Sequence, residues 1–387
     1  MRITYYFCIA IISLLLFSCV AKHPQFVKKQ EIIYQTDFPM RDPYGIFYNT
    51  EDRTEYFYIA EMMDLKKLLF FTIEGKKAME IPTDSVSNWR TTTGIAIKNL
   101  DTIVILMSGT VGKGNDKIIF MDRKGNRLKK IELDDAIQAD ENNWKYFFYK
   151  NSSFEQDILF LRAELIHKTV DSSLLKTKNY DLILRDIIPK THKAHVLLKY
   201  NIQTDQYQYA LSNMWRIICS DTNLYIFPPQ FTVENNILFV YSAEIGNILY
   251  LLNKENFQIK KKIAITSPYT DIGVQPCSLG GRMGYYYQDN TPLHGELINI
   301  MYDKYNRYYY VIIRHATEDP LLKDEASFSI QIYDRKFNKL TEQVFDGKEY
   351  YRGACLVCSQ GLLIGHSSDR KDYNPTEVKY DLFKIEK

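Results

Sequence analysis

One hairpin shape returns five times along this chain and limits what the chain can fold into. Each copy has an apolar strand, a polar turn and a second strand in which lysines interrupt the apolar residues. The copies are KLLFFTIEGKKAMEI from Lys67, KIIFMDRKGNRLKKIEL from Lys117, LLKYNIQTDQYQYAL from Leu197, LYLLNKENFQIKKKIAI from Leu249 and IQIYDRKFNKLTEQVF from Ile330. Helical periodicity is nearly absent, so the pattern predicts an all-β protein.

A further strand pair precedes each hairpin, and one more pair follows the last hairpin. These pairs begin at Gly45, Gly94, Tyr146, Gln230, Glu296 and Gly353. The chain therefore consists of six units, each with up to four strands. A repeated four-stranded unit predicts a six-bladed β-propeller, because each small sheet must bury its faces against the neighbouring blades.

The sixth unit lacks an outer strand. After its first pair it has one more strand, VKYDLFKIE, and the sequence ends at Lys387. The strand-like segment QFVKKQEIIYQ, Gln25 to Gln35, is available to fill the position. We expect the N-terminal strand to join the C-terminal blade, which removes an exposed edge and closes the ring. Residues 25–387 are then a single propeller domain.

The first residues have the pattern of a secretory signal. Arg2 is followed by an apolar run from Cys8 to Phe17, which is too short to span a bilayer. The next residues, LFSC from Leu16 to Cys19, resemble the bacterial lipobox, in which the cysteine becomes acylated. We predict a signal peptide at 1–18, lipidation of Cys19 and a short linker at 19–24, with stable membrane anchoring. The alternative is an ordinary signal peptide with an incidental cysteine.

The expected location is the bacterial cell envelope. Surface-exported lipoproteins of the Bacteroidota resemble one another in an acidic cluster after this cysteine, and VAKHPQFVKK lacks one. We therefore expect a periplasm-facing protein.

Lysine and arginine number 49 against 47 acidic residues, a net charge of +2, which argues against an electrostatic nucleic-acid binder. We expect a monomer.

Two cysteines lie in the CxxC spacing of ACLVCS, Cys355 and Cys358. The run is strand-like, so positions i and i+3 point to opposite faces, and the two thiols are expected to be structural and not a redox pair. An oxidising compartment permits a disulfide between Cys219 and Cys277, but the sequence does not require one.

Long insertions all fall on one face of the predicted disc. They include the segment from Leu165 to about His195, the Gly-rich link before the fifth unit, ATEDPLLKDEAS in the fifth unit and SSDRKDYNPTE in the sixth. Long loops on one side of a rigid scaffold commonly carry function. We expect the binding face there.

On that face the ends of the second strands align across the repeats. The aligned residues are Glu61, Ser108, Glu164, Glu244, His315 and His366. Carboxylates and imidazoles around an axis could hold a divalent cation such as Ca²⁺, with Glu61, Glu164 and Glu244 as metal ligands, or place a general acid and base. The alternative is that strands simply have polar ends where they meet solvent.

The first residues of the innermost strands are also similar from unit to unit, and they often place an aromatic residue beside a cation. The candidate ligand-binding residues here are Trp89, Arg90, Trp144, His294, Tyr351 and Arg352, and Tyr44 occupies the matching place in the first unit. Arg314, His315 and His366, at the ends of second strands on the same face, complete the candidate ligand-binding set. Stacking and forked donors suit a sugar ring or an anionic ligand. The alternative is that the aromatic residues pack between blades while the cations cap the rim.

The segment YDKYNRYYYVIIRHATEDP, Tyr302 to Pro320, resembles the Tyr-Asp-Lys-Tyr … Tyr-Tyr … Arg-His segment of the uncharacterised six-bladed β-propeller lipoproteins of the Bacteroidota. The likeness extends over the whole mature chain. It implies the same fold and cell-envelope location but no activity. In the repeat, Arg314 and His315 emerge on the long-loop face, whereas most of the tyrosines are expected to pack between blades.

Two functions remain open. The first is a binding propeller that holds a glycan, a peptide or a protein partner, which the absence of a nucleophile elbow or an HExxH sequence favours. The second is a metal-dependent hydrolase or lyase with a Glu/His ring over the central channel. The sequence does not decide whether the protein is an enzyme.

Overall fold

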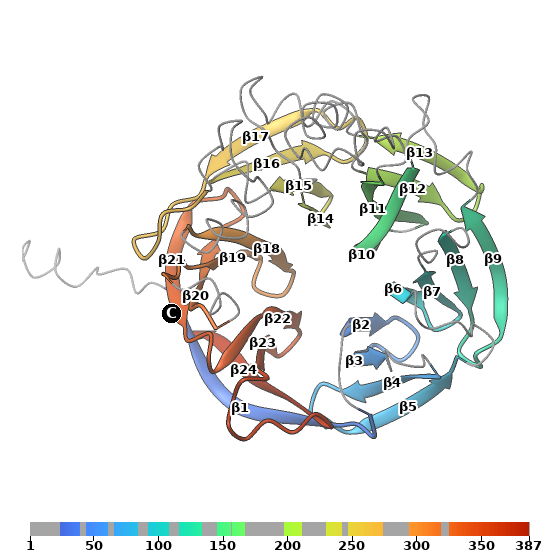
Figure 1. Cartoon of the computed structure of the whole chain (residues 1–387), viewed down its shortest axis with the longest axis horizontal. Helices are drawn as coiled ribbons and strands as arrows, with labels where there is room; N and C mark the ends of the chain where they lie inside the picture. Colours follow the sequence, from blue (N-terminus) through green and yellow to red (C-terminus); the bar gives the residue numbers. More distant parts are fainter. Residues whose placement is uncertain are drawn as a thin grey trace, which may run out of the picture.

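Six four-stranded antiparallel sheets form a closed ring around a central axis (Figure 1). The structure is a computed structural model. It describes residues 24–38, 44–60, 66–83, 92–107, 116–133, 145–155, 157–166, 197–210, 230–241, 247–273, 294–318 and 325–386. The described residues contain no helix, and so none that could cross a membrane. The predicted six-bladed β-propeller is confirmed.

In blades 1 to 5 the strands follow chain order from the axis outward (Figure 1). Blade 1 consists of β2 (Tyr44–Asn49), β3 (Thr54–Ala60), β4 (Lys67–Thr72) and β5 (Lys77–Pro82). Blade 2 consists of β6 (Thr92–Asn99), β7 (Thr102–Met107), β8 (Asp116–Met121) and β9 (Arg127–Leu133). Blade 3 consists of β10 (Lys145–Glu155), β11 (Ile158–Ile166), β12 (Leu197–Asn201) and β13 (Gln206–Ala210).

Blades 4 and 5 continue the pattern, and blade 6 joins both ends of the propeller. Blade 4 consists of β14 (Gln230–Glu234), β15 (Ile237–Tyr241), β16 (Ile248–Asn253) and β17 (Ile259–Ala264). Blade 5 consists of β18 (Glu296–Asp303), β19 (Tyr308–Arg314), β20 (Phe328–Tyr333) and β21 (Lys339–Phe345). Blade 6 consists of β22 (Tyr350–Cys358), β23 (Gly361–His366), β24 (Glu377–Glu386) and, outermost, β1 (Gln25–Gln35).

The two strands of the repeated hairpin differ because they occupy different places in a blade. In β20 all six residues are buried, since this third strand is covered on both faces. In the outermost strand β17, the lysine-rich IKKKIA, only Ile263 is buried. Lysines on an outer strand keep its free edge from pairing with other chains. The apolar strand followed by a lysine-bearing strand is therefore the signature of positions three and four in a blade.

Hydrophobic clusters fill each junction between neighbouring blades. The described core contains six of them, one for each pair of adjacent blades around the ring. Tyr309 and Tyr310 are buried in the clusters on the two sides of blade 5. Cys355 and Cys358 likewise lie in the clusters on opposite sides of blade 6, as buried free thiols. Both predictions from strand alternation are confirmed, whereas Cys219 and Cys277 lie outside the described residues.

Strand β1 closes the ring by contacting three blades. It pairs with β24 from Gln25 opposite Glu386 to Gln35 opposite Glu377, with one shift of register between Lys28 and Gln30. The ring of Phe26 packs against Tyr310 of blade 5, with centroids 5.4 Å apart. At the other end Tyr34 stacks on Phe57 of blade 1, with centroids 4.1 Å apart. The predicted N-terminal closing strand is confirmed.

Candidate functional site

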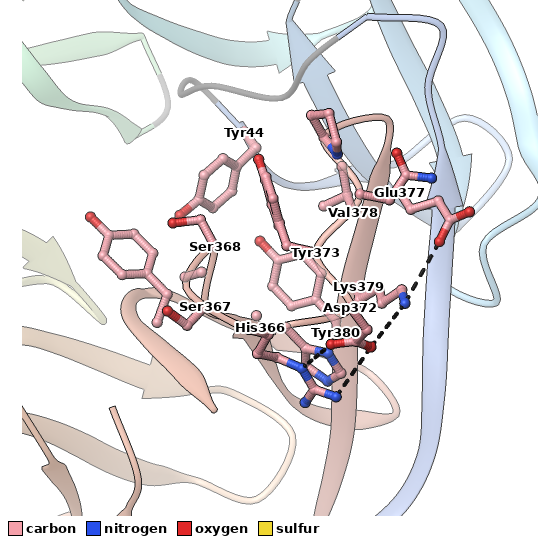
Figure 2. Close-up of a pocket in the computed structure, with 16 residues that line it drawn as sticks. Tyr44, His366, Ser367, Ser368, Asp372, Tyr373, Glu377, Val378, Lys379 and Tyr380 are labelled. Atoms are coloured by element: carbon pink, nitrogen blue, oxygen red, sulfur yellow. Dashed lines mark hydrogen bonds and ion pairs between the residues drawn. The ribbon is translucent and has the colours of Figure 1, made fainter. Parts of the chain in front are cut away.

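A pocket of about 300 Å³ opens on the long-loop face between blade 6 and blade 1 (Figure 2). Its wall is formed by the start of β22, the end of β23, the connection 367–376 and the start of β24, with Tyr44 of β2 opposite. We call it the blade-six pocket. Such a volume is at the lower end of the range for small-molecule sites.

The connection between β23 and β24 is held in shape by its own hydrogen bonds. The amide of Asp369 donates to Ser367 Oγ at 3.2 Å, and the amide of Tyr373 donates to the carbonyl of Arg370 at 3.1 Å. Thr36, which follows β1, donates from its hydroxyl to the carbonyl of Thr376 at 3.0 Å. These hydrogen bonds preorganise the loop, which reduces the entropy cost of binding.

Four tyrosines supply most of the aromatic surface of the pocket. They are Tyr44, Tyr351, Tyr373 and Tyr380. Tyr351 is 42% exposed and Tyr373 is 47% exposed. Tyr44 is held in place because its hydroxyl donates to the carbonyl of Gly353 at 3.0 Å. Exposed tyrosine rings beside polar groups provide stacking area for a ring-shaped ligand.

Charged groups line the outer part of the pocket and are paired with one another. Arg370 Nε lies 2.9 Å from Asp372 Oδ1, and Lys379 Nζ lies 3.3 Å from Asp372 Oδ2. The hydrogen bonds from Arg370 and then Lys379 lower the pKa of Asp372, so the carboxylate is ionised at neutral pH. Asp372 is exposed, whereas Arg370 and Lys379 are half-buried, so a polar ligand can exchange hydrogen bonds with the exposed carboxylate at little cost.

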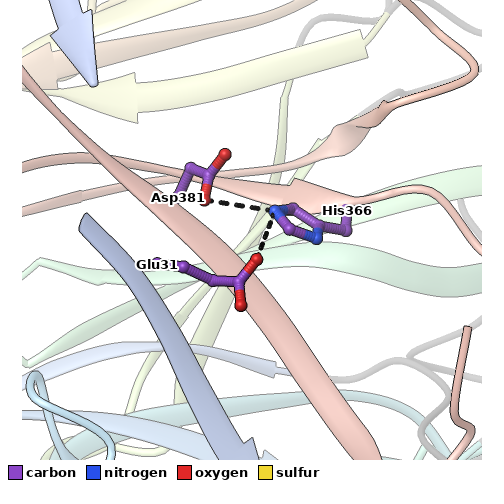
Figure 3. Close-up of side chains that lie close together, drawn as sticks. All are labelled: Glu31, His366 and Asp381. Carbon is purple, nitrogen blue, oxygen red and sulfur yellow. Dashed lines mark ion pairs between the residues drawn. The ribbon is translucent and has the colours of Figure 1, made fainter. Parts of the chain in front are cut away.

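His366 ends β23 and belongs both to the pocket wall and to a polar cluster behind it. Its Nε2 lies 3.2 Å from Asp381 Oδ1 and 3.9 Å from Glu31 Oε2 (Figure 3). Its Nδ1 is buried and has no hydrogen-bond partner among the described residues. Burial by itself raises the pKa of Asp381, but interactions with His366, Lys28 and Tyr350 outweigh it and lower the pKa to about 2.

Two of the predicted ligand-binding residues, Tyr351 and His366, line this pocket. Arg314 does not face solvent at all. Its guanidinium donates to the carbonyls of His315 and His294, each at 3.0 Å, and its Nε lies 3.3 Å from Glu296 Oε2. The side chain of Arg314 is fully buried, so its role is to hold the backbone at His294 and His315 in place.

The other predicted residues of the described part are spread along the rim. His315 is buried and stacks on Tyr269, with ring centroids 5.9 Å apart, and burial lowers its pKa. His294 is half-buried and Arg352 is buried. Neither is among the residues that line the blade-six pocket.

Several predictions fall where the structure gives no account. The side chain of Glu164 is not described, although its backbone pairs with Phe147 in blade 3. Residues outside the described part are Cys19, Glu61, Trp89, Arg90, Trp144 and Glu244. The Glu/His ring, the Ca²⁺ site and the lipid anchor therefore stay predictions.

Glu31 and Asp381 are the residues that the sequence did not single out. Glu31 is an exposed residue of β1, and Asp381 lies in a run of four buried residues of β24, and no sequence motif marks either of them. They meet because β1 and β24 pair in the register that places Glu31 opposite Asp381. Only that pairing, between segments from opposite ends of the chain, could have revealed the cluster.

Comparison with known proteins identifies the fold. No family model and no curated protein sequence matches this chain. A solved structure of a member of the DUF4221 family from Bacteroides vulgatus superimposes with a TM-score of 0.69. The two proteins share a fold. They are 16% identical, and the match covers 94% of this chain and 99% of the Bacteroides protein. This similarity supports the expected likeness to uncharacterised Bacteroidota propellers and says nothing of lipidation.

Two other solved structures give weaker matches. A subtype N10 neuraminidase-like protein of A/little yellow-shouldered bat/Guatemala/060/2010 aligns over 93% of this chain with 8% identity and a TM-score of 0.41. TolB from Acinetobacter baumannii aligns over 88% of this chain with 9% identity and a TM-score of 0.38. No functional residue is transferred from either protein.

Proposed function

We propose that this protein is a lipid-anchored binding propeller of the cell envelope. Its blade-six pocket holds one ring-shaped polar unit of a ligand, such as a single sugar of a glycan. The observation that carries the proposal is the pair of exposed tyrosines, Tyr351 and Tyr373, beside a preorganised polar loop. Tyrosine faces stack on the apolar face of a sugar, while hydroxyl and charged groups at the edge bond its hydroxyls.

Charged groups at the pocket support a polar ligand in particular. The pairs Arg370–Asp372 and Lys379–Asp372 place donors and an acceptor at the same opening. A neutral polyhydroxylated unit suits this mixture better than a strongly charged one.

The test is a screen of the purified chain against glycans, followed by calorimetry with the best ligand. Tyr351→Ala or Tyr373→Ala is expected to weaken binding about tenfold, since an aromatic stacking contact contributes roughly 1.4 kcal/mol. Tyr207→Ala, on the outer strand β13 and similarly exposed at 42%, is the matched control and should leave affinity unchanged. Equal affinity in all three variants would show that the ligand binds elsewhere.

A further inference from the structure

Three potential metal ligands converge within blade 6, on three adjacent strands. Glu31 lies on β1, Asp381 on β24 and His366 on β23, and one ligand atom from each lies within 4.8 Å of the others (Figure 3). We call them the closure cluster. Glu31 is directly opposite Asp381, and Asp381 is directly opposite Ile364, two residues before His366. Strand alternation therefore puts all three side chains on one face.

We propose that the closure cluster binds a divalent transition-metal ion of the Zn²⁺ type, which ties the N-terminal strand into the last blade. One imidazole nitrogen and two carboxylate oxygens form a ligand set that Zn²⁺ takes in proteins. With metal–ligand bonds of about 2.0–2.2 Å, tetrahedral ligand atoms are separated by roughly 3.3–3.6 Å. The observed separations from His366 Nε2, 3.2 Å to Asp381 and 3.9 Å to Glu31, lie close to this range.

The second, independent observation is that the cluster leaves buried ligand atoms unsatisfied. His366 Nε2 and Asp381 Oδ1 are both buried, and neither has a hydrogen-bond partner among the described residues. Their distance of 3.2 Å permits an ion pair, but the two groups are not aligned for a hydrogen bond. Buried polar atoms are nearly always satisfied in folded proteins. A cation between them would satisfy both atoms at once.

The surroundings fix Asp381 in the orientation that a ligand needs. Its other oxygen, Oδ2, accepts a hydrogen bond from Tyr350 at 2.7 Å and lies 2.5 Å from Lys28 Nζ. Such outer contacts orient metal ligands. Oδ1 is thereby directed at His366. The ammonium of Lys28 opposes a cation electrostatically, but its side chain is 46% exposed and can turn towards solvent.

Bound metal would have a structural consequence that follows from its place in the fold. It would join β1 to β23 and β24 at the blade that closes the ring, so it should stabilise the closed propeller. His366 also lines the blade-six pocket. The metal site nevertheless needs no pocket ligand, so its test is independent of the proposed sugar binding.

The experiment uses the full chain, treated with a chelator and then titrated with ZnCl₂ by calorimetry, with bound metal measured by mass spectrometry. We expect one Zn²⁺ per chain and a melting temperature that rises with Zn²⁺. Glu31→Gln and His366→Gln should each weaken binding at least about tenfold. Lys28→Gln should tighten it, because it removes the competing charge. Glu386→Gln, on β24 and exposed, is the control and should bind as the native chain does.

Asp381→Asn is unsuitable as the main variant, because Asp381 is wholly buried and the change can impair folding. Glu31 is partly exposed, so Glu31→Gln should fold, which circular dichroism would verify. The absence of any Zn²⁺ uptake by the native chain would overturn the proposal. So would uptake that persists unchanged in both Glu31→Gln and His366→Gln, because the ion would then be held by other residues.

Discussion

Truncating Phe26 should destabilise the whole propeller, although this residue lies near the start of the described chain. Phe26 is 5% exposed on β1, and its ring contacts Tyr310 and Phe345 of blade 5. Its amide and carbonyl bond the side chain of Gln343 at 3.0 and 3.3 Å. These contacts are the junction between the closing strand and blade 5.

The expected cost of Phe26→Ala is about 3 kcal/mol. Phenylalanine-to-alanine changes in protein cores cost about 3–5 kcal/mol. The lower end applies because β1 is an outermost strand, where neighbouring groups can relax into the cavity. Tyr34→Phe, at the junction with blade 1, should cost about 1 kcal/mol, since it removes only the hydrogen bond to the carbonyl of Ile73.

Urea unfolding measures the loss of stability in Phe26→Ala as a shift of the urea concentration at half-unfolding, while the dependence of the unfolding free energy on urea stays unchanged. The control is Ile33→Ala on the same strand, where the side chain is 42% exposed, and it should change stability by less than about 0.5 kcal/mol. If Phe26→Ala costs no more than Ile33→Ala, the reasoning is refuted, because β1 would not then be part of the cooperative ring.

Two further predictions concern pH and membrane attachment. Burial raises the pKa of Glu342, but hydrogen bonds from Lys339, Ser267, Ser329 and Gln331 outweigh it and lower the pKa. Glu342→Gln should therefore cost about 2 kcal/mol at pH 7. In acid titrations of unfolding this difference should be complete above pH 4.5 and shrink as the pH falls through the lowered pKa; a constant difference would contradict it. Cys19→Ser should move the protein from the membrane fraction to the soluble fraction, as cell fractionation followed by immunoblotting would show, and unchanged sedimentation would contradict lipidation.

The fold was predictable because its information is local and repeated. In blade 5, the apolar run of β20 and the mixed run of β21 differ in burial as the hairpin pattern predicts. The alternation of side chains along a strand also predicted correctly that Cys355 and Cys358 lie on opposite faces of β22. Even the ring closure was predictable. The sixth unit lacked an outer strand, and the N-terminal strand belonged to no unit, so pairing the two removes both exposed edges.

Arg314 marks the limit of that reasoning. Its repeat position placed it correctly at the end of β19, and the sequence led us to expect its charge on the binding face. In the structure the guanidinium turns inward to the carbonyls of His294 and His315. A strand pattern predicts the face to which a side chain points, but not which backbone groups lie within its reach.

The sequence by itself therefore determined the six blades, the closing strand and the face that carries the long connections, because these depend on alternation over a few residues. Only the tertiary structure decided which side chains share a site. Glu31 and Asp381 are separated by almost the entire propeller in sequence, and one register between β1 and β24 makes them neighbours. Tyr44 and Tyr373 come from different blades and meet at one pocket only because the ring closes.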